Sequence, residues 1–196
     1  NGNLIQPNAE PGDIKFVDQN EDGVINEDDE VYSGTAIPKY EYSLNLTGEY
    51  KGFDLTVFFQ GVGGNKVYNG NDFRLLSLDT GRNYRTAALD AWTPNNTNTD
   101  VPRAVLNDPN RNNRASTRFL EDGDYLRLKT LQLGYTLAPD VLKNTFVDRA
   151  RIFVTGQNLL TVTDYSGLDP EVGGSVLSRG IDLNLYPKYK SLITGV

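Results

Sequence analysis

The residues with the clearest chemical spacing are the acidic and amide side chains between Asp18 and Asp29. They read Asp-x-Asn-x-Asp-Gly with an acid at the twelfth position, which is the pattern of a calcium-binding loop. Calcium is a hard cation that takes about six to eight oxygen ligands, so oxygen donors must recur at short intervals along the chain. The spacing predicts a calcium site formed by Asp18, Asn20, Asp22, Val24, Asn26 and Asp29.

The positions of this loop have different expected roles. The first, third and fifth offer side-chain oxygens, the seventh offers its backbone carbonyl, and the ninth acts through a water. Gly23 permits the sharp turn, and Asp29 closes the shell with a side chain one methylene shorter than the usual Glu. The alternative is an acidic surface turn without metal. No helix pattern flanks the loop and no second copy occurs, so we expect the ion to pin a loop rather than to drive a switch.

The sequence offers little for catalysis. Histidine and cysteine are both absent, which removes the usual general base, the commonest metal ligand and all thiol chemistry. The patterns G-x-S-x-G, H-E-x-x-H and the P-loop do not occur. A glycosidase would need two carboxylates, but nearly all acids lie in expected turns or in the calcium loop. We therefore predict no enzyme activity. The net charge of −7 argues against nucleic acid as a partner.

Three aromatic residues in expected long loops are candidates for ligand contact, because an aromatic face can pack on the apolar side of a sugar ring. They are Tyr84, Trp92 and Tyr165. The alternative for Trp92 is that it anchors its own loop. Four arginines make the same region locally basic, and we expect most of them to be solvated or paired with nearby acids. These are Arg103, Arg111, Arg114 and Arg118.

The elements that must position these residues are β-strands. Between residues 40 and 61, apolar and polar residues alternate in two runs that a Lys51-Gly52 turn separates. Successive side chains of a strand point to opposite faces, so the two runs predict a β-hairpin with one apolar face. Phe58 is the single apolar residue on the polar side. The apolar face could pack on a second sheet or face lipid, and alternation alone leaves both open.

Further strands are expected downstream, with one short strand at 14–17 upstream. The residues from 126 to 135 alternate but change phase once, which predicts a β-bulge. Residues 151–162 and 186–196 read as two more strands, and Tyr84–Trp92 as two helical turns. No run approaches the ~18 apolar residues of a membrane-spanning helix.

The connections between these strands alternate in length. They span residues 49–52, then 61–121, then 138–149, then 163–185, so short and longer loops take turns. Outer-membrane barrels have short periplasmic turns and long extracellular loops. The pattern therefore predicts an all-β fold of about five antiparallel strands, forming part of a transmembrane β-barrel. We expect residues 1–39 to be an extracellular loop with the calcium motif and residues 40–196 to be one continuous unit of strands and loops.

Several ordered motifs together resemble the C-terminal part of the SusC/RagA-type TonB-dependent outer-membrane receptors of Bacteroidetes. They read GDIKFVDQNEDGVI, YKGFDLTVFFQGVGGN, GDYLRLKTLQLGYTL, RIFVTGQNLLTVTDYSGLDPEV and YPKYKS. The resemblance implies a barrel in the bacterial outer membrane that imports glycans or other nutrients. It also implies a SusD-like surface lipoprotein as a partner and TonB as the source of energy. The family's plug domain and TonB box have no counterpart in this sequence.

The chain begins at Asn1 without a signal segment, so we expect it to be a piece of a longer precursor. Plugged outer-membrane transporters have about 22 strands, and five strands cannot close a barrel. We therefore expect an open sheet with two unpaired edges and an exposed apolar hairpin face. The alternative function is a soluble, calcium-stabilised carbohydrate-binding β-sandwich, in which the same face would be buried.

Overall fold

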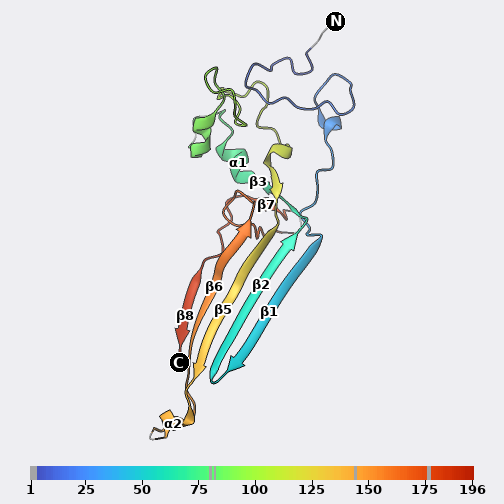
Figure 1. The fold of residues 1–196 in the computed structure, drawn as a ribbon. Coiled ribbons are helices and arrows are strands. Elements are labelled where there is room, and N and C mark those ends of the chain that lie inside the picture. The colour runs from blue at the N-terminus through green and yellow to red at the C-terminus, as the bar shows by residue number, and fades with distance from the viewer. Residues whose placement is uncertain (1–3, 80, 82, 144, 176–177) are drawn as a thin grey trace. The chain divides into compact units, whose positions relative to one another are not determined.

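A computed structural model describes residues 4–79, 81, 83–143, 145–175 and 178–196 (Figure 1). The chain divides into two compact units. Unit 1 comprises Asn1–Gly34 and Tyr68–Leu120, and unit 2 comprises Thr35–Val67 and Glu121–Val196. The chain passes from one unit to the other after Gly34, within strand β3 (Lys66–Asn69) and within strand β4 (Leu120–Asp122). This division differs from the expected one at residue 39, because the long connection packs with the N-terminal segment rather than with the strands.

Unit 2 is built on a five-stranded antiparallel sheet (Figure 1). Its strand order is β1-β2-β5-β6-β8, so β1 and β8 form the two edges. The expected number of strands and the expected open sheet are confirmed. The strands are β1 (Tyr40–Tyr50), β2 (Phe53–Gly63), β5 (Tyr125–Thr136), β6 (Arg151–Thr163) and β8 (Ser191–Gly195).

The predicted hairpin is formed by β1 and β2, with Tyr50 opposite Phe53. Lys51 and Gly52 connect the strands with φ angles of 48° and 86°. Two residues with positive φ make the type I′ turn, whose twist matches that of the flanking strands. A Cβ at Gly52 would lie 2.9 Å from the carbonyl oxygen of Thr136, so glycine also allows this close approach.

The predicted bulge lies in β5. Leu128 is opposite Phe59 of β2, whereas Thr130 is opposite Phe58, so Lys129 is the extra residue. The pairing of β5 with β6 shifts at the same point. The inserted residue reverses the phase of the alternation, and Leu133 therefore lies on the same face of the sheet as Leu128. The bulge keeps one apolar face continuous along the strand.

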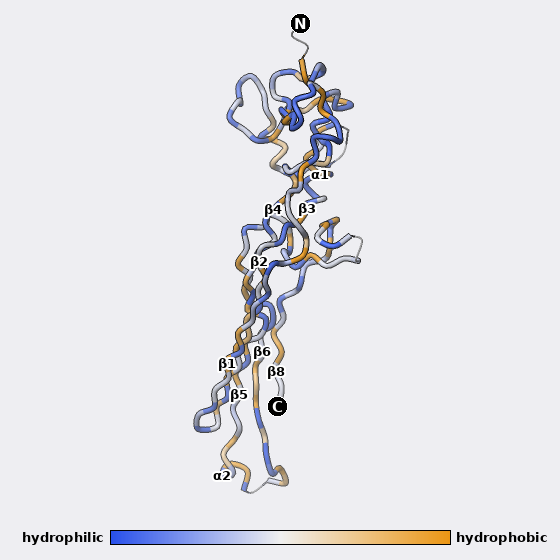
Figure 2. Tube along the Cα trace, turned by 90° about the vertical axis from the view of Figure 1, so that its right-hand side faces the viewer, coloured by the Kyte–Doolittle hydropathy of each residue, from blue (hydrophilic) through white to orange (hydrophobic). Residues whose placement is uncertain are grey.

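That apolar face is exposed in the described structure. Leu44 in β1 is 51 % exposed, Leu133 in β5 is 47 % exposed and Leu160 in β6 is 55 % exposed. Hydrophobic and hydrophilic segments alternate along these strands (Figure 2). A soluble monomer rarely exposes so extended an apolar patch, so this face needs an apolar neighbour. The soluble sandwich, which would bury these residues, does not match the structure.

The opposite, polar face carries a buried ion cluster. Arg127 of β5 is almost fully buried and donates to Asp169, to Glu171 at 3.0 Å and to Thr161 Oγ1 at 2.9 Å. Lys129 Nζ, from the bulge, lies 2.7 Å from the same Glu171 carboxylate. The cluster therefore fixes the segment after β6 onto the sheet.

Asp169 is the carboxylate that holds this segment most firmly. Burial acts to raise the pKa of Asp169, but hydrogen bonds from Arg127 and from the backbone N–H groups of Lys188 and Glu171 outweigh it and leave the pKa lowered. Lys188 N donates to Asp169 at 2.7 Å, and Asn158 Nδ2 donates to the carbonyl of Tyr189 at 3.1 Å. These contacts use the backbone groups before Ser191, so β8 is shorter than the predicted strand at 186–196.

A glycine in β5 makes room for a second ion pair on the polar face. Arg151 Nε donates to Asp54 Oδ1 at 2.8 Å, which links β6 to β2 across β5. A Cβ on Gly134 would lie 2.4 Å from both side chains. The pair can therefore bridge three strands only because residue 134 has no side chain.

Unit 1 contains short helices around a small aromatic core. The Phe119 ring is buried and contacts the rings of Tyr68 and Phe73, with centroid separations of 6.1 and 5.4 Å. The helical turns predicted at Tyr84–Trp92 correspond to a 3-10 helix, η2 (Thr86–Asp90). The others are η1 (Glu27–Asp29), α1 (Gly70–Leu75) and η3 (Thr117–Phe119).

The predicted strand at 14–17 is wrong, because these residues have irregular backbone. Side-chain amides take the place of a neighbouring strand. Asn112 Oδ1 accepts from Ile14 N at 2.8 Å, Gln6 Oε1 accepts from Phe16 N at 2.8 Å, and Asn110 Nδ2 donates to Ile14 O at 3.0 Å. Because side chains already hydrogen-bond these backbone N–H and C=O groups, the segment does not need to pair with a neighbouring strand.

Two minor elements complete unit 2. The connection between β5 and β6 contains a short helix, α2 (Pro139–Leu142), and β7 (Ile181–Asp182) joins a three-stranded sheet of order β4-β3-β7. In the described residues, no helix has the length and apolar character needed to cross a membrane.

The exposed apolar face predicts that the purified chain aggregates in buffer and disperses in a non-ionic detergent. The double substitution Leu44→Lys with Leu55→Lys places charges on this face and should reduce the dependence on detergent, as light scattering would show. The matched control, Asn45→Lys with Thr56→Lys, places them on the polar face and should leave the dependence unchanged. Equal behaviour of the two variants would contradict the facial assignment.

The buried ion cluster predicts that Arg127→Met lowers the free energy of unfolding by about 3–5 kcal/mol, because two carboxylates lose their partner in a buried site. Lys143 pairs with Asp140 at 2.8 Å on the surface, and both side chains are well exposed. Lys143→Met should therefore cost less than about 1 kcal/mol. Denaturant unfolding in detergent measures both values, and similar losses would show that the cluster contributes no more than a surface pair.

Candidate functional site

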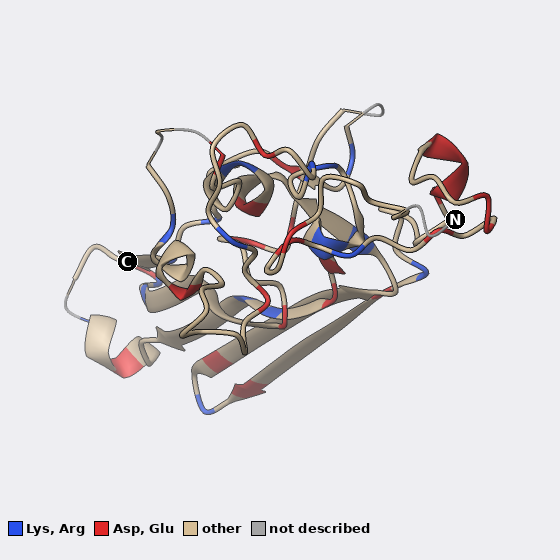
Figure 3. Ribbon diagram, turned by 90° about the horizontal axis from the view of Figure 1, so that it is seen from above, with Lys and Arg blue, Asp and Glu red and all other residues tan. Residues whose placement is uncertain are grey.

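The acidic loop from Asp18 to Asp29 is held by hydrogen bonds to its own backbone. Asp18 Oδ2 accepts from Gly23 N at 2.8 Å, and Asp22 Oδ1 accepts from Val24 N at 2.9 Å. Asn20 Oδ1 accepts from Asp22 N at 3.0 Å. Gly23 has a φ of 84°, as the predicted sharp turn requires. The loop ends in η1, which consists of acidic residues only (Figure 3).

The last two predicted ligands close the loop by a capping box. Asn26 Oδ1 accepts from Asp28 N at 2.6 Å, and Asp29 Oδ2 accepts from Asn26 N at 2.8 Å. The other oxygen of Asp29 accepts from Gln19 N at 2.7 Å. These N–H groups, Asn26 first, lower the pKa of Asp29. The carboxylate is therefore ionised well below neutral pH.

The chemistry of this loop suits a hard cation, because every predicted donor is an oxygen. Asp18 Oδ1 is buried and has no hydrogen-bond partner, so one carboxylate oxygen stays available for a ligand. In the part of the chain that the structure describes, no three acidic side chains are gathered closely enough to hold a metal ion. The donor set fits calcium, but binding would have to draw these side chains together.

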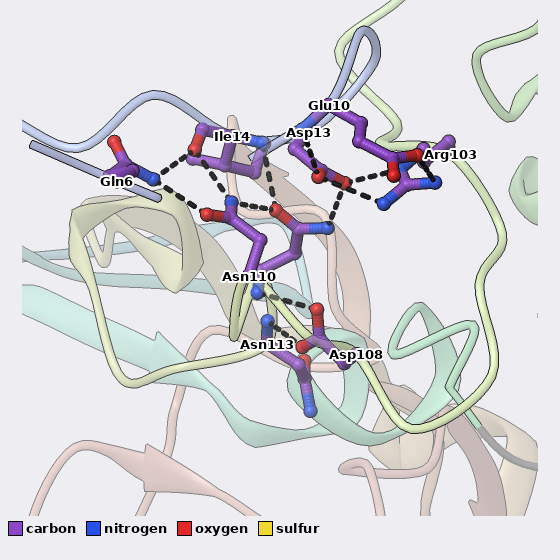
Figure 4. Close-up of polar contacts among 9 residues, drawn as sticks. Gln6, Glu10, Asp13, Ile14, Arg103, Asp108, Asn110 and Asn113 are labelled. Atoms are coloured by element: carbon purple, nitrogen blue, oxygen red, sulfur yellow. Dashed lines mark hydrogen bonds and ion pairs between the residues drawn. The ribbon is translucent and has the colours of Figure 1, made fainter. Parts of the chain in front are cut away.

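A polar network fixes the N-terminal segment that carries this loop (Figure 4). Arg103 Nε donates to Asp13 Oδ1 at 2.7 Å, and its Nη1 lies 2.7 Å from Glu10. Burial acts to raise the pKa of Asp13, but hydrogen bonds from Arg103 and Asn112 outweigh it and leave the pKa lowered. Arg103 is therefore paired with acids, as expected for the arginines of this region.

Unit 2 has a cavity of about 450 Å³ beside the buried ion cluster. Its charged lining residues carry both signs and are Glu41, Asp169, Glu171, Arg179 and Lys188. Tyr125 and Tyr186 add aromatic surface. Arg127 and Lys129 already neutralise the two acids of the cluster, so the cavity combines paired and unpaired polar groups with apolar surface. Such a surface suits the binding of a polar ligand.

Of the three predicted ligand-binding aromatics, Tyr84 and Trp92 belong to unit 1 and Tyr165 belongs to unit 2. Tyr165 is buried, and its hydroxyl donates to Asp182 Oδ2 at 2.7 Å. The Trp92 ring packs on Gly12, where a Cβ would lie 2.4 Å from it. Both side chains therefore make packing contacts within their own units, and ligand contact by these aromatics stays a prediction.

The ion cluster around Arg127 was missed in the sequence. Its signal was present, because Arg127 and Lys129 are cationic residues within an apolar strand pattern. Their partners Asp169 and Glu171 lie in a glycine-rich loop, and no local pattern links such a loop to a particular strand. The pairing depends on the antiparallel register of β5 with β6.

Comparisons with known proteins identify relatives along nearly the whole chain. The TonB-dependent receptor P3 of Formosa agariphila is 36 % identical over 98 % of this chain, which spans 19 % of that relative. The TonB-dependent receptor SusC of Bacteroides thetaiotaomicron is 29 % identical over 98 % of the chain and 18 % of its own length. The chain thus spans about a fifth of these curated relatives. No family model matches the chain.

Solved structures give the same result for the fold. The structure of the RagAB peptide transporter matches with a TM-score of 0.70 and 30 % identity, covering 83 % of this chain and 17 % of that one. The RagAB peptide importer in its 'open-open' state matches with a TM-score of 0.68. The similarity in sequence and the similarity in fold both agree with a sheet that has one exposed apolar face. The chain is therefore homologous to one part of the SusC/RagA-type TonB-dependent receptors.

Proposed function

We propose that this chain is part of a receptor in the bacterial outer membrane that binds a nutrient and imports it with energy from TonB. The observation that carries the proposal is the five-stranded sheet with one exposed apolar face and one polar face. A strand pattern of this kind is expected where one face meets lipid and the other meets a wet lumen. The chain's part in this function is binding and transport, without catalysis.

The free edges of the sheet support the same assignment. Among the described strands, β1 and β8 each pair with one neighbour in this sheet, and all residues of β1 are exposed. In lipid, an open edge would leave unsatisfied backbone groups, which only closure with further strands avoids. The remainder of the receptor would supply those strands, together with the plug and the segment that contacts TonB.

We place the long loops on the extracellular side, where a SusD-like lipoprotein and the nutrient would meet them. The loop between β6 and β8 lines the polar cavity of unit 2. Tyr84 and Trp92 belong to the long connection that follows β2, and both side chains are partly exposed. They remain our candidates for contact with a sugar ring, through the exposed part of each aromatic ring.

The nutrient that we favour is a glycan or oligosaccharide. Peptides are the second candidate, because the RagAB structures similar to this chain are named as a peptide importer and a peptide transporter. The unit 2 cavity has both acidic and basic side chains beside aromatic ones, which could serve either ligand. Only uptake can separate the two classes.

Uptake by the complete receptor tests this function. We expect the full-length receptor, produced with its lipoprotein partner in a bacterium that lacks it, to fractionate with the outer membrane. It should import labelled oligosaccharides, and the import should stop when TonB is deleted. Import of labelled peptides alone would select the second candidate. Import that persists without TonB, or recovery in the soluble fraction, would contradict the proposal.

We also propose that calcium binds the loop from Asp18 to Asp29. The support is the ordered series of oxygen donors and the unpartnered Asp18 Oδ1. Asp18, Asp22 and Asp29 would supply charge, and Val24 would supply its carbonyl. Bound calcium would replace part of the internal hydrogen bonding and stiffen the loop.

Calorimetric titration with calcium should show binding to the chain, and Asp18→Ala should weaken it at least about tenfold because a carboxylate ligand is lost. Asp28→Ala is the matched control, since Asp28 lies in the same loop, is exposed and occupies no ligand position. Its titration should resemble that of the unsubstituted chain. Absence of heat at millimolar calcium would remove the site.

A further inference from the structure

Unit 1 contains a cavity of about 440 Å³ that is lined by residues of this unit alone. Apolar side chains form part of its wall, among them Phe16 and Tyr68. The polar part includes two arginines, Arg114 and Arg118, and the hydroxyl-bearing residue Ser116. Both arginines belong to the basic group that we expected to be solvated or paired with acids.

Arg118 has a buried donor without a partner. Its Nη1 is buried and makes no hydrogen bond, and the guanidinium lies 5.0 Å from the centre of the Phe119 ring. Burial lowers the pKa of Arg118, while Asp72, Asp100 and Asp108 act in the opposite direction without forming an ion pair with it. The group is thus a desolvated cation that still has free N–H bonds.

Arg114 lines the same cavity, and hydrogen bonds are made by two of the three nitrogens of its guanidinium. Its Nε donates to the carbonyl of Arg111 at 3.2 Å and its Nη2 to the carbonyl of Asn110 at 3.0 Å. The guanidinium lies 4.1 Å from the centre of the Phe16 ring. Burial, followed by the charge of Arg111, lowers the pKa of Arg114. These contacts fix the orientation of the group but leave its charge unmatched.

The acids near this cavity do not pair with either arginine. Neither Arg114 nor Arg118 forms an ion pair with any residue that the structure describes, although Arg103 of the same segment pairs with two. Two acids, Asp29 and Glu30, and a third cation, Lys15, also line the cavity. The two oxygens of Asp29 accept from backbone N–H groups, and the lining as a whole carries three cations against two acids. Ser116 Oγ is buried without a partner as well. The cavity therefore combines positive charge with unsatisfied donors.

We propose that this cavity binds an oxyanion, the carboxylate, sulfate or phosphate group of a ligand. Buried donors are normally satisfied, and a planar guanidinium pairs with two oxygens of an oxyanion at once. Arg118 is the principal partner, Ser116 donates a hydroxyl, and Arg114 adds charge. The inference goes beyond the proposed transport function and holds independently of which nutrient is imported.

Calorimetric titration of the full chain in an uncharged detergent tests this site. The probes are sodium sulfate, sodium phosphate and digalacturonate, with sodium chloride at equal ionic strength as the blank. We expect at least one oxyanion to bind, and Arg118→Gln to weaken that binding by about tenfold or more because a charged hydrogen-bond donor is lost. Arg114→Gln should weaken it in the same direction.

Arg111→Gln is the matched control, since it removes the same charge from the same segment at an exposed position outside the cavity. It should bind the oxyanion as the unsubstituted chain does. Circular dichroism of each variant shows whether it has folded. Arg118→Lys keeps the charge and should retain part of the affinity that Arg118→Gln loses.

Tighter binding of digalacturonate than of the inorganic ions would identify an acidic sugar as the source of the group, and the reverse would identify a free ion. Equal weakening by Arg111→Gln and Arg118→Gln, or no binding of any oxyanion above the chloride blank, would overturn the proposal.

Discussion

The structure depends on the two-residue period of its strands, which separates apolar from polar side chains on the two faces of one sheet. No layer formed by the residues that the structure describes buries the apolar face, since Leu44 in β1 and Leu160 in β6 remain half exposed. Burial of apolar surface is the dominant favourable term in folding, so a face of this size must be covered by something other than water. Hydrocarbon on one side and water on the other satisfy both faces together.

The other features of unit 2 preserve that separation. The bulge at Lys129 corrects the phase of β5, so that the leucines before and after it lie on one face. The charges of the strands are confined to the opposite face, where Arg127 is paired and buried and Arg151 bridges to Asp54 over Gly134. An unpaired charge would be costly in a dry setting, and pairing removes most of that cost.

Local patterns were sufficient to predict the sheet but not unit 1. The hairpin and the bulge follow from the period and phase of adjacent residues, so their prediction needed no knowledge of distant contacts. The segment at Ile14 has an equally apolar pattern, yet its backbone is satisfied by the side chains of Gln6, Asn110 and Asn112. Two of these partners lie almost a hundred residues away, and no spacing rule connects them. The acidic partners of Arg127, Asp169 and Glu171, could not be predicted for the same reason.

The most direct test of the account is a comparison of the two faces in a membrane. The chain contains no cysteine, so a single introduced cysteine can carry a nitroxide label. The two variants are Leu131→Cys on the apolar face and Gln132→Cys on the polar face. Each is made in the full-length receptor freed of any other cysteine and reconstituted in lipid vesicles. Electron paramagnetic resonance then reports collision with oxygen, which concentrates in lipid, and with a water-soluble nickel complex. We predict higher oxygen accessibility at residue 131 and higher nickel accessibility at residue 132. Equal accessibilities, or the reverse order, would contradict the claim that the apolar face meets lipid.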